Sequence, residues 1–222
     1  QPWHGHALGR DRALEPGRSL KTQDLEAHGG YHGALVTKTG STRGSVILSR
    51  LAFVRKEKGD EAVQRVLRTL TAEDQQLFGG TVVSNVWYPF EAGERLDVAI
   101  AAELGGGEAT FKLMGARSAE FNLGDTQKLF VEGRDPHGLL RSASAIYRLY
   151  YDTGSRTYHA SGGRKAVLRT LQSKTFSPWD CLTVIGWHEK AIEMCGGRNP
   201  RVTHTKCRAR GDGLCEYLCE WG

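Results

Sequence analysis

The apolar residues of this chain change their spacing about two thirds of the way along the sequence. Up to about residue 150 they recur every three or four positions, as in Val63, Val66 and Leu67, which is the spacing of one helical face. Beyond that point, short alternating segments surround glycine pairs and are typical of antiparallel hairpins, with one long helix predicted over 178–195. We therefore predict an α/β (α+β) fold: a helical N-terminal two thirds packed with a C-terminal antiparallel sheet crossed by a long helix.

The first forty or so residues differ from the rest in composition. Glycine recurs there without a hydrophobic period, and Pro2 and Pro16 interrupt the polar stretches. Segments of this kind are commonly solvated arms. We predict a flexible arm or linker over 1–42, with one short strand at 33–39, and a single ligand-binding domain over 43–222.

Composition restricts the classes of function. No stretch approaches eighteen apolar residues, so we expect no membrane partner. Four of the five cysteines lie between Cys195 and Cys219, an arrangement that favours reduced thiols in a cytoplasmic protein over a disulfide scaffold. The phosphate-binding loop, the Gly-x-Ser-x-Gly elbow and the dinucleotide fingerprint are all absent from the sequence, so we do not expect an enzyme.

The end of the chain is predicted to form two strands joined by a turn at 211–213. A register that pairs Cys207 with Tyr217 buries the sulfur-bearing face, because alternate side chains on a strand point to opposite faces. The inward face then carries Thr203, Thr205, Cys207, Ala209, Cys215, Tyr217, Cys219 and Trp221. The outward face carries His204, Lys206, Arg208 and Arg210.

The long helix brings a further cysteine to this ribbon. Its apolar stripe includes Cys181, which could approach Cys207 and Cys215 if the stripe faces the sheet. Two or three thiolates and a histidine can hold a tetrahedral zinc ion. His204 is the candidate histidine, although it lies on the opposite face from Cys207 unless a bulge rotates it inward. The alternative is that these cysteines are only small buried apolar residues.

Aromatic residues suggest a second kind of site. They occur in three predicted segments, which together could line a pocket for a small apolar or aromatic molecule. The candidate lining residues are Trp87, Tyr88, Phe90, Phe111, Met114, Phe121, Tyr147 and Tyr151. Such stripes are also what an ordinary hydrophobic core looks like, and this alternative stays open.

A basic segment supports an alternative function. Arg198, Arg201, Lys206, Arg208 and Arg210 have no acidic residue between them and could follow a phosphate backbone. No aromatic residue is interleaved, and basic side chains often protect an edge strand, so nucleic acid is not the main expectation. The alternative function is a structural zinc-binding regulatory domain that contacts nucleic acid or a protein partner through 198–210.

The motif at 207–217 reads CRARGDGLCEY and is followed by Trp221. It resembles the end of the bacterial 4-vinyl reductase domain, which belongs with haem-nitric-oxide-binding sensors and TRAPP-type trafficking subunits in one superfamily. Upstream pieces resemble an uncharacterised branch abundant in myxobacteria, and the resemblance covers about 43–222. These pieces include Arg43-Gly44-Ser45, Trp87-Tyr88-Pro89 and Tyr150-Tyr151-Asp152.

The resemblance implies a non-enzymatic sensor or scaffold module that binds a small molecule, forms a homodimer and signals to a protein partner. It also implies a zinc site, since Cys181, Cys207 and Cys215 match the family's ligand spacing and His204 is the nearest fourth ligand. The haem branch needs a proximal histidine and a Tyr-x-Ser-x-Arg motif. That motif is absent from the sequence, which argues against haem; the histidines considered as haem ligands are His137 and His188.

Overall fold

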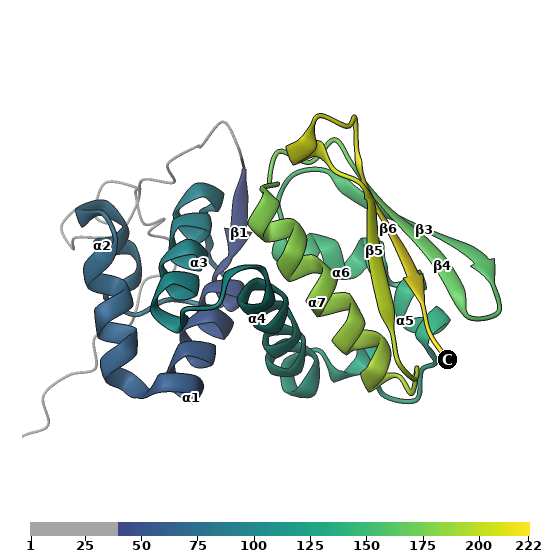
Figure 1. The fold of residues 1–222 in the computed structure, drawn as a ribbon, viewed down its shortest axis with the longest axis horizontal. Helices are drawn as coiled ribbons and strands as arrows, with labels where there is room; N and C mark the ends of the chain where they lie inside the picture. The colour runs from purple at the N-terminus through teal and green to yellow at the C-terminus, as the bar shows by residue number, and fades with distance from the viewer. Residues whose placement is uncertain (1–39) are drawn as a thin grey trace, which may run out of the picture. The chain divides into compact units, whose positions relative to one another are not determined.

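The computed structural model describes residues 40–222, except for the side chains of residues 125 and 126. The strand predicted at 33–39 and nearly all of the predicted arm lie outside the described residues. The N-terminal part of the described chain is mainly helical (Figure 1). Its elements are β1 (Ser41–Arg43), α1 (Gly44–Thr69), α2 (Ala72–Phe78), β2 (Trp87–Pro89), α3 (Phe90–Leu104) and α4 (Gly107–Phe121).

The C-terminal part contains a four-stranded antiparallel sheet in the order β3-β4-β6-β5. Its elements are α5 (Pro136–Arg141), α6 (Ala143–Tyr150), β3 (Ser155–Gly162), β4 (Lys165–Leu171), α7 (Pro178–Met194), β5 (Arg201–Lys206) and β6 (Cys215–Glu220). Figure 1 shows α7, in light green, running across one face of this sheet beside α4. The predicted α+β architecture is confirmed, including the long crossing helix.

Local signals explain several helix ends. Gly59 has φ 80° and ψ 176°, so the long α1 segment is kinked where the sequence predicts that one helix ends and another begins. The side chain of Thr71 accepts a hydrogen bond from the amide of Asp74 and caps α2. The side chain of Ser177 caps α7 in the same way, and Pro178 follows at the first helical position.

The sequence pattern predicts one helix over 125–132 and another that begins at Asp135 and ends at Gly154, and the structure corrects both. Residues 125–132 do not form an α-helix: a π-helical turn covers Asn122–Thr126 and a short 3-10 helix covers Lys128–Phe130. The segment between Gly124 and Gly133 is too short to stabilise a regular helix by itself. The single helix predicted from residue 135 onward is divided in two at Ser142, whose ψ is 2°.

The ribbon register also differs from the prediction. Tyr217 pairs with His204 rather than with Cys207, and the irregularity between His204 and Lys206 is a β-bulge. A bulge adds one residue to one strand and reverses which side chains face inward beyond it. For that reason Thr203 and Thr205 are exposed, and residues 208–210 form a 3-10 turn instead of continuing the strand. The burial predicted for Cys207, Cys215, Tyr217 and Cys219 is confirmed.

The described chain has two hydrophobic cores. One lies among α1 to α4 and includes Leu96 and Ile100; the other lies under the sheet and includes Leu168 and Ile192. Partly buried Leu182 of α7 packs against both. The two cores are therefore adjacent, and α4 and α7 run along the boundary between them.

Two glycines allow α4 and α7 to cross with their backbones in contact. A Cβ on Gly115 would lie 1.9 Å from the carbonyl oxygen of Thr183, and one on Gly186 would lie 1.9 Å from that of Lys112. Any larger residue at either position would push the helices apart. This close crossing sets the position of the side chains that α7 carries toward the interior.

Candidate functional site

The four predicted metal ligands come together beneath the N-terminal end of α7. Cys181 lies one turn into that helix, His204 lies in β5, Cys207 follows β5, and Cys215 begins β6. One ligand atom from each lies within 4.8 Å of the others, and all three thiols are free and buried. The sulfur atoms of Cys181 and Cys207 are 3.8 Å apart. The spacing along the sequence therefore corresponds to a true cluster in space.

Strand alternation alone would place His204 on the opposite face from Cys207, and the β-bulge removes this difficulty. It turns the imidazole inward, where the ring stacks on Tyr217 with centroids 4.3 Å apart. The Nε2 atom of His204 is buried and has no hydrogen-bond partner in the described chain. A buried ring nitrogen without a partner is costly unless it binds something that the protein itself does not supply.

Backbone groups also converge on the sulfur atoms. The amide of Arg208 donates to the sulfur of Cys215 at 3.4 Å, and the carboxylate of Asp212 accepts from the amide of Cys207 at 2.7 Å. The nearby thiol of Cys181, and then the nearby imidazole of His204 and the Arg208 amide, lower the pKa of Cys215. The nearby thiol of Cys215, and then burial, raise the pKa of Cys181. The cluster thus favours one thiolate even without a metal ion.

This geometry suits a tetrahedral thiophilic ion. Zinc–sulfur bonds of about 2.3 Å in a tetrahedron place two sulfur atoms about 3.8 Å apart. The pair Cys181 and Cys207 already has that separation. Three sulfurs and one imidazole nitrogen complete a Cys₃His set, which is a common structural zinc site.

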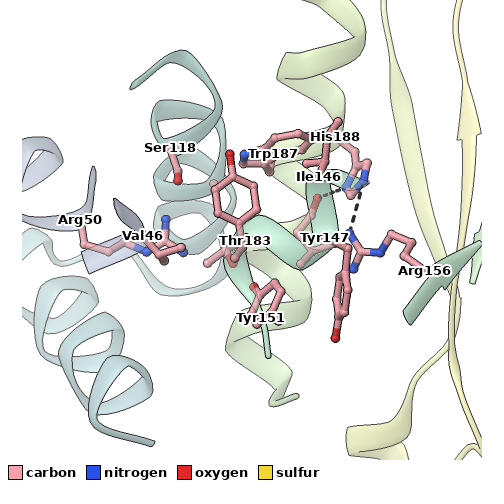
Figure 2. A pocket seen from close by; sticks show the side chains of 13 residues that line it. Val46, Arg50, Ser118, Ile146, Tyr147, Tyr151, Arg156, Thr183, Trp187 and His188 are labelled. Carbon is pink, nitrogen blue, oxygen red and sulfur yellow. Dashed lines mark hydrogen bonds between the residues drawn. The ribbon is translucent and has the colours of Figure 1, made fainter. Parts of the chain in front are cut away.

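A separate cavity lies on the boundary between the two cores (Figure 2). Its volume is about 40 Å³, and its wall is mostly apolar. Residues from α1, α4, α6, β3 and α7 line it, so it touches both parts of the described chain. Those that matter below are Arg50, Tyr147, Tyr151, Arg156, Trp187 and His188.

Arg156 and His188 form a buried contact at one end of this cavity (Figure 2). Nδ1 of His188 donates to the Val184 carbonyl at 2.8 Å, so Nε2 carries the lone pair and lies 3.5 Å from the Arg156 guanidinium. The guanidinium also donates to the hydroxyl of Thr170 and lies 4.9 Å from the centre of the Tyr147 ring. Burial, and then the charge of Arg156, lower the pKa of His188 to about 3, so this histidine is neutral.

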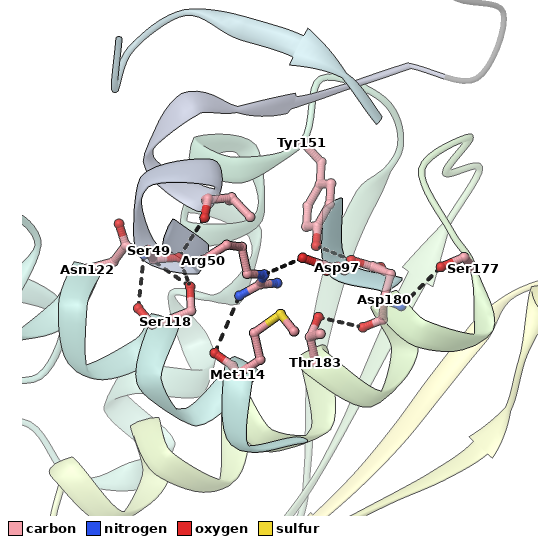
Figure 3. Close-up of polar contacts among 11 residues, drawn as sticks. Ser49, Arg50, Asp97, Met114, Ser118, Asn122, Tyr151, Ser177, Asp180 and Thr183 are labelled. Carbon is pink, nitrogen blue, oxygen red and sulfur yellow. Dashed lines mark hydrogen bonds and ion pairs between the residues drawn. The ribbon is translucent and has the colours of Figure 1, made fainter. Parts of the chain in front are cut away.

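A polar seam continues from the cavity toward α3 (Figure 3). Buried Arg50 pairs with Asp97 at 2.9 Å and donates to the Met114 carbonyl. The hydroxyl of Tyr151 donates to Asp180 at 2.7 Å. Burial raises the pKa of Asp97 against the charge of Arg50, and burial raises the pKa of Asp180 to about 7.

Most of the aromatic residues predicted to bind a ligand do not line this cavity. Only Tyr147 and Tyr151 of the eight residues line the cavity. Tyr88, Phe111 and Met114 belong to the helical core, because their stripes face neighbouring helices. Phe90 packs near Tyr151 outside this cavity, while Trp87 and Phe121 are exposed.

The basic residues do not form one surface. Arg198 and Arg201 lie at the opposite end of β5 from Arg208 and Arg210, with exposed Lys206 at the end of the strand. Arg208 is half-buried, lies over the Phe176 ring and donates to the Ser173 carbonyl. A continuous phosphate-binding track therefore finds no support in the described residues.

Sequence reasoning missed the polar part of the cavity. Arg156 occupies an inward position of β3, and the sequence does not associate His188, which lies on the apolar stripe of the long helix, with this arginine. One signal was available: alternation in the segment 155–160 places Arg156 on the same face as Tyr158. An arginine on the inward face of a strand indicates a polar site in the interior.

The comparisons with known proteins identify the fold. No family model matches the sequence, and no curated protein matches it. Solved structures do match: an H-NOX protein from S. oneidensis in the Fe(II)NO state has a TM-score of 0.64 and 15% identity, over 81% of this chain and 99% of that one. An Fe(II) unliganded H-NOX protein mutant from K. algicida has a TM-score of 0.62 and 13% identity, over 81% of this chain and 96% of that one.

Two expectations are corrected by these matches. The similar structures are consistently H-NOX domains, so the assignment to a 4-vinyl reductase-like domain is wrong. That assignment relied on a short C-terminal motif, whereas the structural match covers 81% of the chain. The argument against haem is also contradicted, because the similar structures include haem proteins, one of them in work on haem redox potential and porphyrin distortion.

The donor atoms around the cavity provide a test of how haem would fit. His188 offers a neutral imidazole, but its Nε2 faces Arg156. The volume of 40 Å³ is well below the roughly 300 Å³ or more of typical cofactor pockets. The residues therefore do not fit a haem in this conformation, and Arg156 would have to move before His188 could reach an iron atom. What the geometry and the matches together establish is that this chain adopts the H-NOX fold.

Proposed function

We propose that this chain is a non-enzymatic sensor module that binds a small molecule in the cavity between its two cores. The observation that carries the proposal is the cavity itself, which is lined from both parts of the chain and has a buried arginine and a neutral histidine at one end. The H-NOX fold supports it, since one similar H-NOX structure has NO on its iron. None of the helices in the described part of the chain could cross a membrane.

A ligand in this cavity would act on α7. That helix contributes Thr183, Val184, Trp187 and His188 to the cavity wall and Cys181 to the sulfur cluster. A molecule that widens the gap between α4 and α7 would favour a different placement of α7 on the sheet. The readout surface would then be the ribbon of β5 and β6, which α7 contacts.

Haem is the first compound to test, because similar structures carry it. Hemin is titrated into the purified chain and followed by absorbance, with Val184→Phe as a variant that fills the cavity and Val98→Phe as the same change on the exposed face of α3. A saturable haem band that Val184→Phe abolishes and Val98→Phe retains would show that the cavity opens for haem. If hemin does not bind, native mass spectrometry and thermal shifts search for a smaller ligand.

The sensor proposal fails if neither hemin nor any retained or added small molecule is affected by filling the cavity. The predicted homodimer, the protein partner and the cytoplasmic location stay predictions. Sedimentation of the purified chain, with and without bound ligand, tests whether it forms a homodimer.

We also propose that Cys181, His204, Cys207 and Cys215 bind one structural metal ion of the zinc type. The support is the set of four converging ligand atoms and the unpartnered Nε2 of His204. Protein prepared under reducing conditions without chelators should contain one ion per chain by elemental analysis. Cys207→Ser should lose it, whereas Cys219→Ser, a matched change at a buried cysteine outside the cluster, should retain it. Metal-free protein with all four ligands intact would contradict this site.

A further inference from the structure

Arg156 is a buried cation without a counter-ion. The residue is only 8% exposed, and no carboxylate of the described chain lies within 4.0 Å of its guanidinium nitrogen atoms. Its charge does influence the carboxyl group of Asp180, but that group is already engaged with the hydroxyl of Tyr151. A buried charge that lacks a partner is strongly unfavourable, so its retention needs an explanation.

The protein compensates this charge only in part. The guanidinium lies between the rings of Tyr147 and Tyr217, at 4.9 and 5.6 Å from their centres, and cation–π contacts of this kind are modest. It donates to Thr170 and to the neutral Nε2 of His188. Arginine has five N–H donors, so the remaining ones have no acceptor among the described residues.

The rest of the cavity wall also lacks negative charge. Of the described residues that line it, two are arginines and none is an aspartate or glutamate. Arg50 is neutralised by Asp97, which leaves Arg156 as the source of uncompensated charge. The indole N–H of Trp187 also belongs to this wall; it is buried and makes no regular hydrogen bond, with the hydroxyl of Tyr150 near it. The wall therefore presents positive donors set among apolar side chains.

We infer that the cavity takes a small organic anion, a short-chain carboxylate whose oxygens accept from Arg156 while its alkyl part contacts the apolar wall. Carboxylate and guanidinium match in a two-pronged geometry, which gives strong charge-assisted hydrogen bonds. The volume of 40 Å³ admits about three water-sized groups, which corresponds to the two oxygens and the methyl group of acetate; propanoate is one group larger. This inference rests on the proposed sensor function, because it names the ligand class of the same cavity.

The test compares each carboxylate with its neutral amide, which has nearly the same shape. Acetate, propanoate, acetamide and propanamide are titrated at constant ionic strength into the full chain, and the indole signal of Trp187 is followed by ¹⁵N NMR. Propanoate should bind at least tenfold more tightly than propanamide. Arg156→Gln should remove at least tenfold of the propanoate affinity and leave the amide unchanged. Arg169→Gln, an exposed arginine on β4, should change neither.

Each outcome supports or overturns the inference. If the amide binds as tightly as the acid, or if only hemin or a neutral molecule binds, the anion inference fails while the sensor proposal stands. If nothing perturbs the cavity signals, both fail. Where Arg156→Gln does not fold, the comparison of propanoate with propanamide on the unaltered protein decides alone.

Discussion

His188 shows how one buried residue can couple the stability of this protein to pH. Its ring is 4% exposed, and burial and then the charge of Arg156 lower its pKa from 6.5 to about 3. The unfolded chain therefore takes up a proton between pH 6.5 and 3 that the folded chain does not. Stability must fall as the pH drops below about 6.5, because protons bind preferentially to the unfolded state.

We expect wild type to lose about 2 kcal/mol of unfolding free energy between pH 7 and 5 through this group, since each pH unit contributes up to about 1.4 kcal/mol. His188→Gln should be less stable at pH 7 but should lack this part of the slope. Urea unfolding at pH 7 and at pH 5 measures this change in the free energy of unfolding. His159→Gln, at an exposed position, should keep the wild-type slope. Parallel slopes in wild type and His188→Gln would contradict the assignment.

The residues of the sulfur cluster could be named from the sequence, whereas most of the cavity residues could not. One face of the long helix carries Cys181 and one face of the ribbon carries Cys207 and Cys215, so packing the helix on the ribbon leaves few other side chains that these thiols can contact. The cavity joins Arg50 to Arg156, which are far apart in the sequence and approach only when both cores have formed. Aromatic content does not identify such a place, because it marks the core and the surface alike: Tyr88 is buried and Phe121 is exposed.

At the scale of elements, the packing of α4 on α7 depends on the two glycines where the helices cross. A methyl group on Gly115 would come within 1.9 Å of a backbone carbonyl on α7, and backbone cannot move aside as a flexible side chain can. Gly115→Ala should therefore cost at least about 1–3 kcal/mol, the range measured for overpacked cores. It should also perturb ligand binding, since both helices line the cavity.

Thermal and urea unfolding of Gly115→Ala measure the cost. Gly80→Ala is the matched control, because a Cβ at Gly80 meets nothing within 4 Å. Equal stability of Gly115→Ala and Gly80→Ala would contradict the close backbone contact between α4 and α7.

The ends of α2 and α7 were predictable because their caps are local: Thr71 and Ser177 act on amides three residues away. The register of β5 was not, because the bulge at His204 depends on how the strand pairs with β6. A shift of this kind reverses the facing of Thr203 and Thr205 without changing the sequence pattern. The same bulge turns His204 toward the three cysteines. It therefore explains both the geometry of the cluster and the wrongly predicted register of β5.

At the scale of the whole molecule, two cores meet along a polar seam. The seam includes the pair of Ser49 with Ser118 at 2.9 Å and the pair of Arg50 with Asp97. Overall architecture was predictable, because the change of hydrophobic period along the chain reflects it directly. The seam was not, since Arg50 and Asp97 are ordinary helix-surface residues in sequence and become buried only where α1, α3 and α4 meet.

The seam makes a quantitative prediction about how the two cores are joined. Removing one member of a buried ion pair leaves the other without compensation, which typically costs about 3–5 kcal/mol, whereas apolar replacement of both is often nearly neutral. Arg50→Met and Asp97→Leu should each destabilise strongly, and the double variant should cost clearly less than their sum. Urea unfolding of the four proteins gives the coupling energy.

An exposed pair provides the control for that cycle. Arg55 and Asp60 are 2.5 Å apart, but their side chains are 53% and 78% exposed, so their coupling should stay below about 1 kcal/mol. If the buried pair couples no more strongly than this, the carboxyl group of Asp97 is already neutral in the folded chain. The cores would then be joined by hydrogen bonds and packing, and the seam would carry no charge pair for a ligand in the adjoining cavity to disturb.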